Sequence, residues 1–344
     1  MKTCPQCHAP HPDDLAVCPT DGSALVEAAA WPEGTAVEGK YRILARIGQD
    51  VICTVYKALE LKSERLYSLH VMSSALSGDP GFVKLFEQDA LQRKKLQHVN
   101  MSRVEGIGES EDGCPFIVME YVAGQSLKKY IELEAPFAPL RACALAKQVA
   151  AALEAAHALG MIHRDVKPES IYLLDGPGPE KIKLLGLGIS KLREALLGDR
   201  FRTSPEAVIG TFQYLSPEQA LGQFGDQLDG RADLYSLGVV MYQMLTRELP
   251  FQATTAADWM MAHILGSPTP IRVAHAKLAI PDVLTNLVMR CLKKNRESRP
   301  ASARQFIREI ELVEKEIDPT EGPGPAAPET PESRKSPGWK FWKS

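Results

Sequence analysis

The order of its apolar segments constrains this chain more than any other feature. Between residues 41 and 121, short stretches rich in Val, Ile, Leu and Tyr flank a helical pattern at 81–97. A long stretch rich in Ala and Leu follows at 139–159 and ends at Gly160, a typical residue to stop a helix. After about residue 216 the pattern is mostly helical. Strands followed by helices predict an α+β fold with a strand-rich N-terminal lobe and a helical C-terminal lobe.

Composition divides the chain into five segments. Residues 1–25 are rich in Cys, His, Pro and Asp and are too short to bury an apolar core. Residues 26–40 are expected to be a linker, because Pro and Gly interrupt a run of small residues. Residues 41–317 carry the apolar pattern of the folded domain. Residues 318–338 are rich in Pro and are expected to be disordered, and residues 339–344 form an aromatic and basic C-terminal peptide.

The overall composition excludes several classes of protein. Hydrophobic residues make up 44% of the 344 residues, which is too many for a wholly disordered chain. The sequence has no run of about 18 apolar residues that predicts a membrane-spanning helix. Its net charge of −3 gives no indication of nucleic-acid binding. Seven cysteines, an odd number without an export signal, favour a protein of the reducing cytoplasm over a disulfide-bonded secreted one.

Two similar cysteine turns lie near the N-terminus. Cys4-Pro-Gln-Cys7 is a C-x-x-C turn, and Cys18-Pro-Thr-Asp21 repeats it with Asp in the last position. Zn²⁺ binds four soft or borderline ligands in a tetrahedron, and paired turns of this kind supply them. We therefore expect a structural zinc site made by Cys4, Cys7, Cys18 and Asp21. The segment resembles a half zinc ribbon, which implies a docking or structural module.

Three alternatives to this site stay open. His8 and His11 compete with Asp21 as the fourth zinc ligand. Residues 4–8 also match the haem-attachment pattern C-x-x-C-H, although Cys18 then has no role. The third alternative is a disordered segment with free thiols.

Five short motifs in the large segment follow the order of one known family. They are VMEYV at 118–122, HRDVKPES at 163–170, GT and YLSPE within 210–218, DLYSLG at 233–238, and RP at 299–300. On these motifs, residues 41–317 resemble the eukaryotic-type Ser/Thr protein kinases, especially the bacterial ones. The resemblance implies a bilobal protein-kinase-like fold that transfers phosphate from Mg-ATP to a protein hydroxyl.

The resemblance implies a catalytic loop at the second motif. His163 and Arg164 open this loop. Asp165 corresponds to the base that takes the proton from the substrate hydroxyl, and Lys167 follows it as a second catalytic residue.

The resemblance also implies a hinge and a scaffold. Glu120 and Val122 lie in the hinge, which holds adenine through backbone groups. Asp233 lies in the buried helix of the C-terminal lobe, and Arg299 is the late arginine that pairs with Glu218.

The loop that covers the phosphates departs from the family pattern G-x-G-x-x-G. Here it reads Gly48-Gln-Asp50-Val-Ile-Cys53, so that only the first glycine remains. Asp50 brings a negative charge to the place of the phosphates, and its two neighbours add bulk. Val55 still fits the strand that leaves the loop.

The ion pair expected between the third strand and the first large helix is also changed. His70 stands at the position of the family's lysine, and imidazole is shorter and mostly neutral near pH 7. Asp89 stands at the position of the helix glutamate. Glu87 is the alternative, but Asp89 shares a helix face with Phe82 and with Arg93, with which its i,i+4 spacing allows an ion pair.

Both positions for metal ligands are changed. Ser170 replaces the asparagine that ends the catalytic loop, and Gly186 replaces the aspartate that binds the Mg²⁺ ions. Mg²⁺ needs hard oxygen ligands, and glycine has no side-chain oxygen. The resemblance also implies that Tyr172 lies at the floor of the adenine pocket, where a leucine is typical, and we expect it to narrow the cleft. These changes predict that Mg²⁺ does not bind and that ATP binds weakly at best.

The hypothesis from the sequence is therefore a pseudokinase, a kinase fold with a regulatory or scaffold role and a protein partner, which is a kinase or its substrate. One alternative is an active Ser/Thr kinase with atypical nucleotide binding. Another is a nucleotide-sensing module that binds ATP without metal.

Two further segments are candidates for regulation. The activation segment runs from Gly186 to Glu218 and includes Thr211. Within it, Thr203 and Ser204 form a candidate phosphosite whose phosphate would pair with Arg164; an ordinary solvated loop is the alternative. In the C-terminal peptide, Trp339, Phe341 and Trp342 alternate with lysines, which suits contact with a membrane surface or a protein groove, or else a disordered tail.

Overall fold

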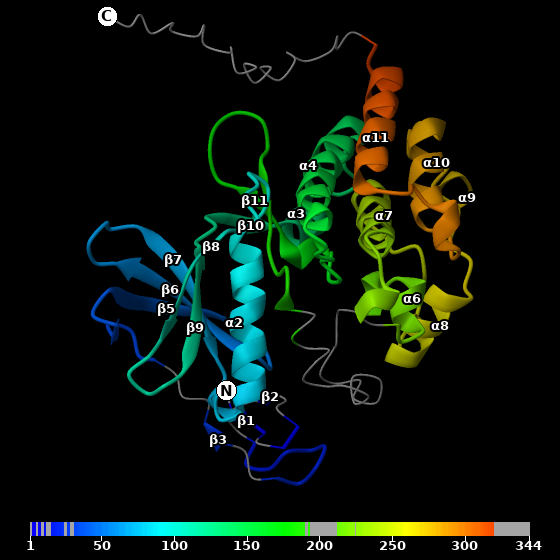
Figure 1. Cartoon of the computed structure of the whole chain (residues 1–344). Coiled ribbons are helices and arrows are strands. Elements are labelled where there is room, and N and C mark those ends of the chain that lie inside the picture. Colours follow the sequence, from blue (N-terminus) through cyan, green and yellow to red (C-terminus); the bar gives the residue numbers. More distant parts are fainter. Residues whose placement is uncertain are drawn as a thin grey trace, which may run out of the picture.

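The computed structural model describes residues 2–4, 6–7, 10–11, 15–23, 26–27, 31–189, 192, 212–223 and 225–319. An antiparallel six-stranded sheet and a group of helices form two lobes that lie side by side (Figure 1). The strand order of the sheet is β4-β5-β6-β7-β9-β8. The strands are β4 (Ala36–Val37), β5 (Tyr41–Gln49), β6 (Cys53–Glu60), β7 (Leu66–Met72), β8 (Val104–Glu109) and β9 (Pro115–Glu120).

Helix α2 (Pro80–Lys94), preceded by the short α1 (Ser74–Ser77), packs on one face of this sheet against β8. The Asp79 carboxylate accepts hydrogen bonds from the N–H groups of Gly81 and Phe82, which caps the helix start. The apolar side of α2 carries Phe82 and Phe86 into the core between helix and sheet. The helix is shorter than the pattern at 81–97 predicts, because the chain turns at Lys95.

The other face of the sheet is covered by residues from the expected linker. The Trp31 ring stacks on Tyr56 with ring centroids 5.5 Å apart, and the backbone N–H of Trp31 donates to the Tyr56 hydroxyl at 2.9 Å. Phe116 packs edge-on against Trp31. Since β4 also pairs with β5, residues 31–40 are part of the N-terminal lobe in the structure.

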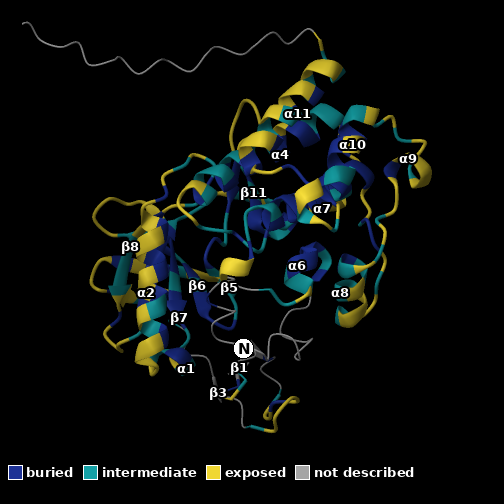
Figure 2. Cartoon of the chain, turned by 45° about the vertical axis from the view of Figure 1, so that its right-hand side comes forward, coloured by how far each residue is buried: buried dark blue, intermediate teal, exposed yellow. Residues whose placement is uncertain are grey.

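The C-terminal lobe is built around α7 (Arg231–Thr246), which is buried along nearly its whole length (Figure 2). Gly238 on α7 leaves room for α10, because a Cβ there would lie 2.6 Å from the Cys291 Cβ. The surrounding helices are α3 (Leu127–Glu134), α4 (Pro139–Ala158), α6 (Pro217–Ala220), α8 (Ala256–Ile264), α9 (Ile271–Ala274), α10 (Asp282–Cys291) and α11 (Ala303–Ile317).

Two small sheets complete the described structure. Strands β10 (Gly124–Ser126), β11 (Ile171–Leu174) and β12 (Ile182–Leu184) form an antiparallel sheet between the lobes. Strands β1 (Lys2–Thr3), β2 (Pro10–His11) and β3 (Val26–Glu27) form an N-terminal sheet in the order β2-β1-β3. Of the helices that the structure describes, none is both long enough and apolar enough to cross a membrane.

Candidate active site

One buried carboxylate holds the backbone at the start of the loop from His163 to Ser170. Asp233 on α7 accepts hydrogen bonds from the backbone N–H of His163 at 2.9 Å and of Arg164 at 2.7 Å. Burial raises the pKa of Asp233, whereas the hydrogen bond from His157 and the two histidine charges lower it, and the net direction is downward. Asp233 therefore stays ionised and holds the loop backbone in place.

The acidic and basic side chains of this loop form a close pair. The Lys167 Nζ lies 2.8 Å from the Asp165 Oδ2. The Ser170 Oγ lies 2.8 Å from the carbonyl oxygen of Lys167 and 3.2 Å from that of Asp165, and it accepts the Lys167 N–H at 3.1 Å. The serine hydroxyl is thus engaged in closing the loop and the 3-10 turn η1 (Pro168–Ser170).

The chain leaves β12 through two glycines beside this loop. Gly186 has a φ of +89°, and among the residues that the structure describes a Cβ there would meet only the His163 Cε1, at 3.9 Å. Gly188 has a φ of +86°, but a Cβ there would lie 2.4 Å from the Asp89 Oδ2 and 2.8 Å from the Arg93 Nε. Space for a side chain is therefore available at Gly186 and is missing at Gly188.

The two charges on α2 pair with each other. The Arg93 Nε lies 2.7 Å from the Asp89 Oδ2, and both side chains are at least nine-tenths buried. Glu87, the alternative residue for this position, is exposed. Desolvation, with a smaller contribution from the Arg93 charge, lowers the pKa of His70 to about 3. His70 on β7 is therefore neutral near pH 7, and Asp89 takes its counter-charge from its own helix.

The loop between β5 and β6 folds onto its own carboxylate. The Asp50 Oδ1 accepts the backbone N–H groups of Ile52 and Cys53, each at 2.8 Å. Val51, Ile52 and Cys53 are buried in the core that includes Phe86 of α2. The Asp50 carboxylate thus accepts the hydrogen bonds of loop N–H groups that an anion would otherwise bind. The apolar side chains fill the space between the loop and α2. Gly48 on β5 pairs with Val55 on β6, so the two strands remain paired on both sides of the loop.

The edge of the site between the lobes contains the candidate adenine-binding residues. The carboxylate of Glu120, the last residue of β9, lies 2.8 Å from the Lys183 Nζ on β12. Val122 follows β9 and is half-buried. Tyr172 on β11 is half-buried and is paired with Lys183 in the small sheet.

Residues 41–310 match the family model described as the protein kinase domain. The chain belongs to the protein kinase domain family. Two curated relatives of this kinase domain are named serine/threonine-protein kinases. Pkn3 of Myxococcus xanthus is 37% identical over 284 residues, which are 82% of this chain and 51% of the relative. PknB of Mycobacterium tuberculosis is 34% identical over 270 residues, which are 78% of this chain and 42% of the relative. The chain therefore spans about half of the length of Pkn3 and less than half of the length of PknB.

A solved structure agrees on the fold. The kinase domain of PknI from Mycobacterium tuberculosis superposes with a TM-score of 0.60 at 24% identity, over 82% of this chain and 99% of that domain. The predicted bilobal arrangement, with a strand-rich N-terminal and a helical C-terminal lobe, is therefore confirmed.

The scaffold of this kinase domain contains a buried ion pair. Two nitrogens of the Arg299 guanidinium lie 2.7 and 2.8 Å from the two carboxylate oxygens of Glu218. The guanidinium also donates to the carbonyl oxygens of Lys293, Lys294 and Arg231. The pair joins the end of the activation segment to the base of the C-terminal lobe.

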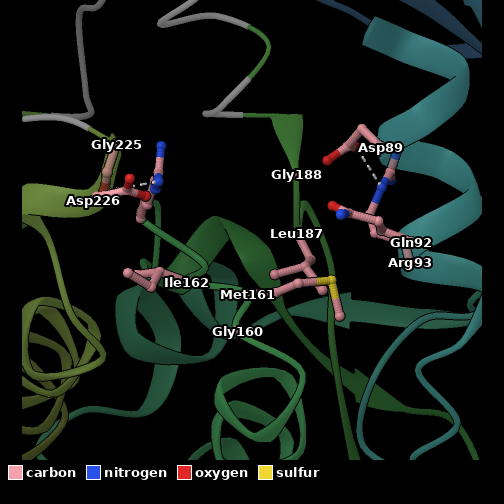
Figure 3. Close-up of a pocket in the computed structure, with 11 residues that line it drawn as sticks. Asp89, Gln92, Arg93, Gly160, Met161, Ile162, Leu187, Gly188, Gly225 and Asp226 are labelled. Carbon is pink, nitrogen blue, oxygen red and sulfur yellow. Dashed lines mark hydrogen bonds and ion pairs between the residues drawn. The ribbon is translucent and has the colours of Figure 1, made fainter.

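A cavity of about 390 Å³ lies between α2 and the catalytic loop of the kinase domain. Asp89, Gln92 and Arg93 line it from α2, beside Gly188, as Figure 3 shows. Arg164 lines it from the catalytic loop.

Several predicted residues fall outside the part of the chain that the structure describes. These are Thr203, Ser204 and Thr211 of the activation segment, His8, and Trp339, Phe341 and Trp342 of the C-terminal peptide. The predicted zinc ligands Cys4, Cys7, Cys18 and Asp21 are described, and they lie together in the N-terminal module.

The two glycines after β12 provide a matched test of packing against α2. Gly188→Ala is expected to lower the free energy of unfolding by about 1–3 kcal/mol more than Gly186→Ala does. The reason is that only Gly188→Ala places a Cβ against the Asp89–Arg93 pair. Both positions have a positive φ, so the backbone strain of alanine, about 1–2 kcal/mol, is common to the two variants. Urea unfolding followed by circular dichroism measures the difference. Equal losses of stability would contradict this packing.

Proposed function

We propose that this kinase domain is a pseudokinase that has lost Mg²⁺-dependent phosphate transfer and acts on protein partners by binding them. The observation that carries the proposal is the chemistry at the two metal positions. Gly186 has no side-chain oxygen, and the hydroxyl of Ser170 is engaged with the backbone of its own loop. Mg²⁺ requires several hard oxygen ligands in a nearly octahedral arrangement, and it usually takes carboxylates.

The charges around the phosphate positions support the same proposal. His70 is neutral, and the positive charge of Arg93 is paired with Asp89 inside α2. The Asp50 carboxylate accepts hydrogen bonds from the loop N–H groups that a phosphate would need. Kinases depend on fixed positive charge and metal to stabilise the transferred phosphoryl group. A site with these substitutions favours weak nucleotide binding at most.

The scaffold supports a binding role. The Glu218–Arg299 pair and the Asp233 anchor are intact and buried, so the C-terminal lobe presents an ordered kinase surface. We propose that this surface binds a protein, either an active kinase or a kinase substrate.

One specific observation favours a second candidate, an active Ser/Thr kinase with atypical nucleotide binding. Asp165 and Lys167 remain paired at 2.8 Å in the catalytic loop, and the relatives named above are kinases by name. In that case another group would have to supply the missing metal ligands.

Titration of the full chain with ATP, in Mg²⁺ and in EDTA, tests the proposal. We expect the dissociation constant to differ by less than about twofold between the two conditions, because the metal has no bridging ligands at Gly186 and Ser170. A tightening of tenfold or more with Mg²⁺, equivalent to ~1.4 kcal/mol, would contradict the proposal.

A further inference from the structure

The N-terminal module contains a cluster of sulfur and oxygen atoms that the kinase site does not use. Cys4 follows β1, Cys7 lies in the next turn, and Cys18 lies in a second turn that ends at Asp21. Their candidate ligand atoms all lie within 4.8 Å of one another. Residues far apart in a short segment thus converge on one point.

The spacing of the cluster fits a bound metal ion, and its cysteines are not joined by a disulfide. The Cys7 and Cys18 sulfurs lie 3.5 Å apart, much farther than the ~2.05 Å of an S–S bond. Tetrahedral zinc with Zn–S bonds of ~2.3 Å requires sulfurs ~3.8 Å apart. The Cys4 sulfur lies 3.2 Å from the Asp21 Oδ2, which suits a sulfur and an oxygen on one zinc ion.

The backbone of the first turn also fixes the position of the Cys4 sulfur. The N–H groups of Gln6 and Cys7 both point at this sulfur, each at 3.4 Å. The Ser23 N–H donates to the Asp21 Oδ1 at 3.0 Å and fixes the carboxylate in the same way.

Burial in the module is concentrated on the cluster. Among the residues of the module whose burial the structure describes, the buried ones are Cys4, His11 and Cys18. A segment of this size has too little apolar area to fold on its own, and zinc supplies that stability in small domains. The sulfur cluster therefore takes the place of a hydrophobic core.

The structure separates two candidates for the fourth ligand. The His11 Nε2 lies 3.4 Å from the Cys18 sulfur, but His11 is not among the residues whose ligand atoms converge. The Asp21 carboxylate is among them and is exposed.

We propose that Cys4, Cys7 and Cys18 bind one Zn²⁺ ion together with the exposed carboxylate of Asp21, and that His11 hydrogen-bonds the Cys18 sulfur from outside the ligand set. A group of that second kind orients a ligand and tunes its metal. The exposed carboxylate makes Asp21 the side from which chelators and water reach the ion.

Metal analysis of the full chain tests the stoichiometry. Elemental analysis after purification without added metal is expected to give one zinc per chain, and none after Cys7→Ser. Cys114→Ser, a half-buried cysteine in the kinase lobe, is the matched control and is expected to keep the zinc. Absence of zinc from the wild type, combined with failure of the chain to bind added Zn²⁺, would overturn the proposal.

Cobalt substitution tests the ligand set without relying on activity. Co²⁺ added to the metal-free chain is expected to give the visible bands of a tetrahedral site and the near-ultraviolet bands of thiolate ligands. Loss of a group outside the ligand set costs ~10–100-fold in metal affinity. Asp21→Ala should raise the dissociation constant for zinc by more than that, whereas His11→Gln should stay within it and keep the stoichiometry and the tetrahedral spectrum. The reverse order of these two variants would overturn the assignment of Asp21 and make His11 the ligand.

Discussion

Replacing Arg299 with alanine is expected to lower the free energy of unfolding by about 3–5 kcal/mol. The guanidinium is fully buried and makes two hydrogen bonds to Glu218 and three to backbone carbonyls. Its removal leaves the Glu218 carboxylate buried without its counter-charge, which costs more than the pair itself contributes.

Urea unfolding of the full chain measures this loss, with Arg304→Ala as the control. Arg304 pairs with Glu154 on the surface, where an ion pair contributes about 0–1 kcal/mol. Glu218→Gln, which keeps the shape and removes the charge, covers the case in which Arg299→Ala does not fold. Similar, small effects of Arg299→Ala and Arg304→Ala would show that the pair does not stabilise the C-terminal lobe.

Restoring the metal and phosphate positions is expected to restore Mg²⁺-dependent ATP binding. The variant combines Asp50→Gly, Ser170→Asn and Gly186→Asp. We expect Mg²⁺ to tighten ATP binding at least ~10-fold in this variant, since it regains an amide oxygen and a carboxylate for the metal. Among the described residues, the nearest neighbour of a Cβ at Gly186 is the His163 Cε1, at 3.9 Å, and aspartate tolerates a positive φ better than most residues.

The control for this variant moves the carboxylate elsewhere. Gly178 lies in the loop between β11 and β12 with a φ of +95°, and a Cβ there would have no described atom within 4 Å. A variant with Asp50→Gly, Ser170→Asn and Gly178→Asp therefore has similar backbone strain and the same net charge. If the two variants respond equally to Mg²⁺, Gly186 is not the position that decides metal binding.

The order of the elements and the face of α2 could be predicted from the sequence. Helical periodicity places Asp89 with Phe82 and Phe86, and all three are buried, whereas Glu87 is exposed. The i,i+4 spacing likewise indicates the Asp89–Arg93 pair that forms. These features depend on neighbours within one helix, which the sequence displays directly.

Features that depend on distant contacts could not be predicted in this way. Trp31 lies in a segment of linker-like composition, and its packing on Tyr56 and Phe116 requires the sheet to be in place. Strand β8 contains Gly106 and Gly108, which weaken its sequence pattern.

In the site itself, the sequence shows which family residues are replaced, but it does not show which contacts the new side chains make. The sequence indicates a negative charge at Asp50, whereas the structure adds that its carboxylate binds the loop's own amides. The low pKa of His70 follows from burial and from Arg93, a residue 23 positions away in the chain. Such effects follow from tertiary contacts and not from local pattern.

Phosphate transfer from radiolabelled ATP tests the central claim most directly. The full chain and its Asp165→Asn variant are incubated with Mg-ATP and a general protein substrate, and transfer to the substrate and to the chain itself is measured. The pseudokinase account predicts that wild type and variant give the same background signal. Mg²⁺-dependent transfer by the wild type that is lost in Asp165→Asn would contradict it and establish an active kinase.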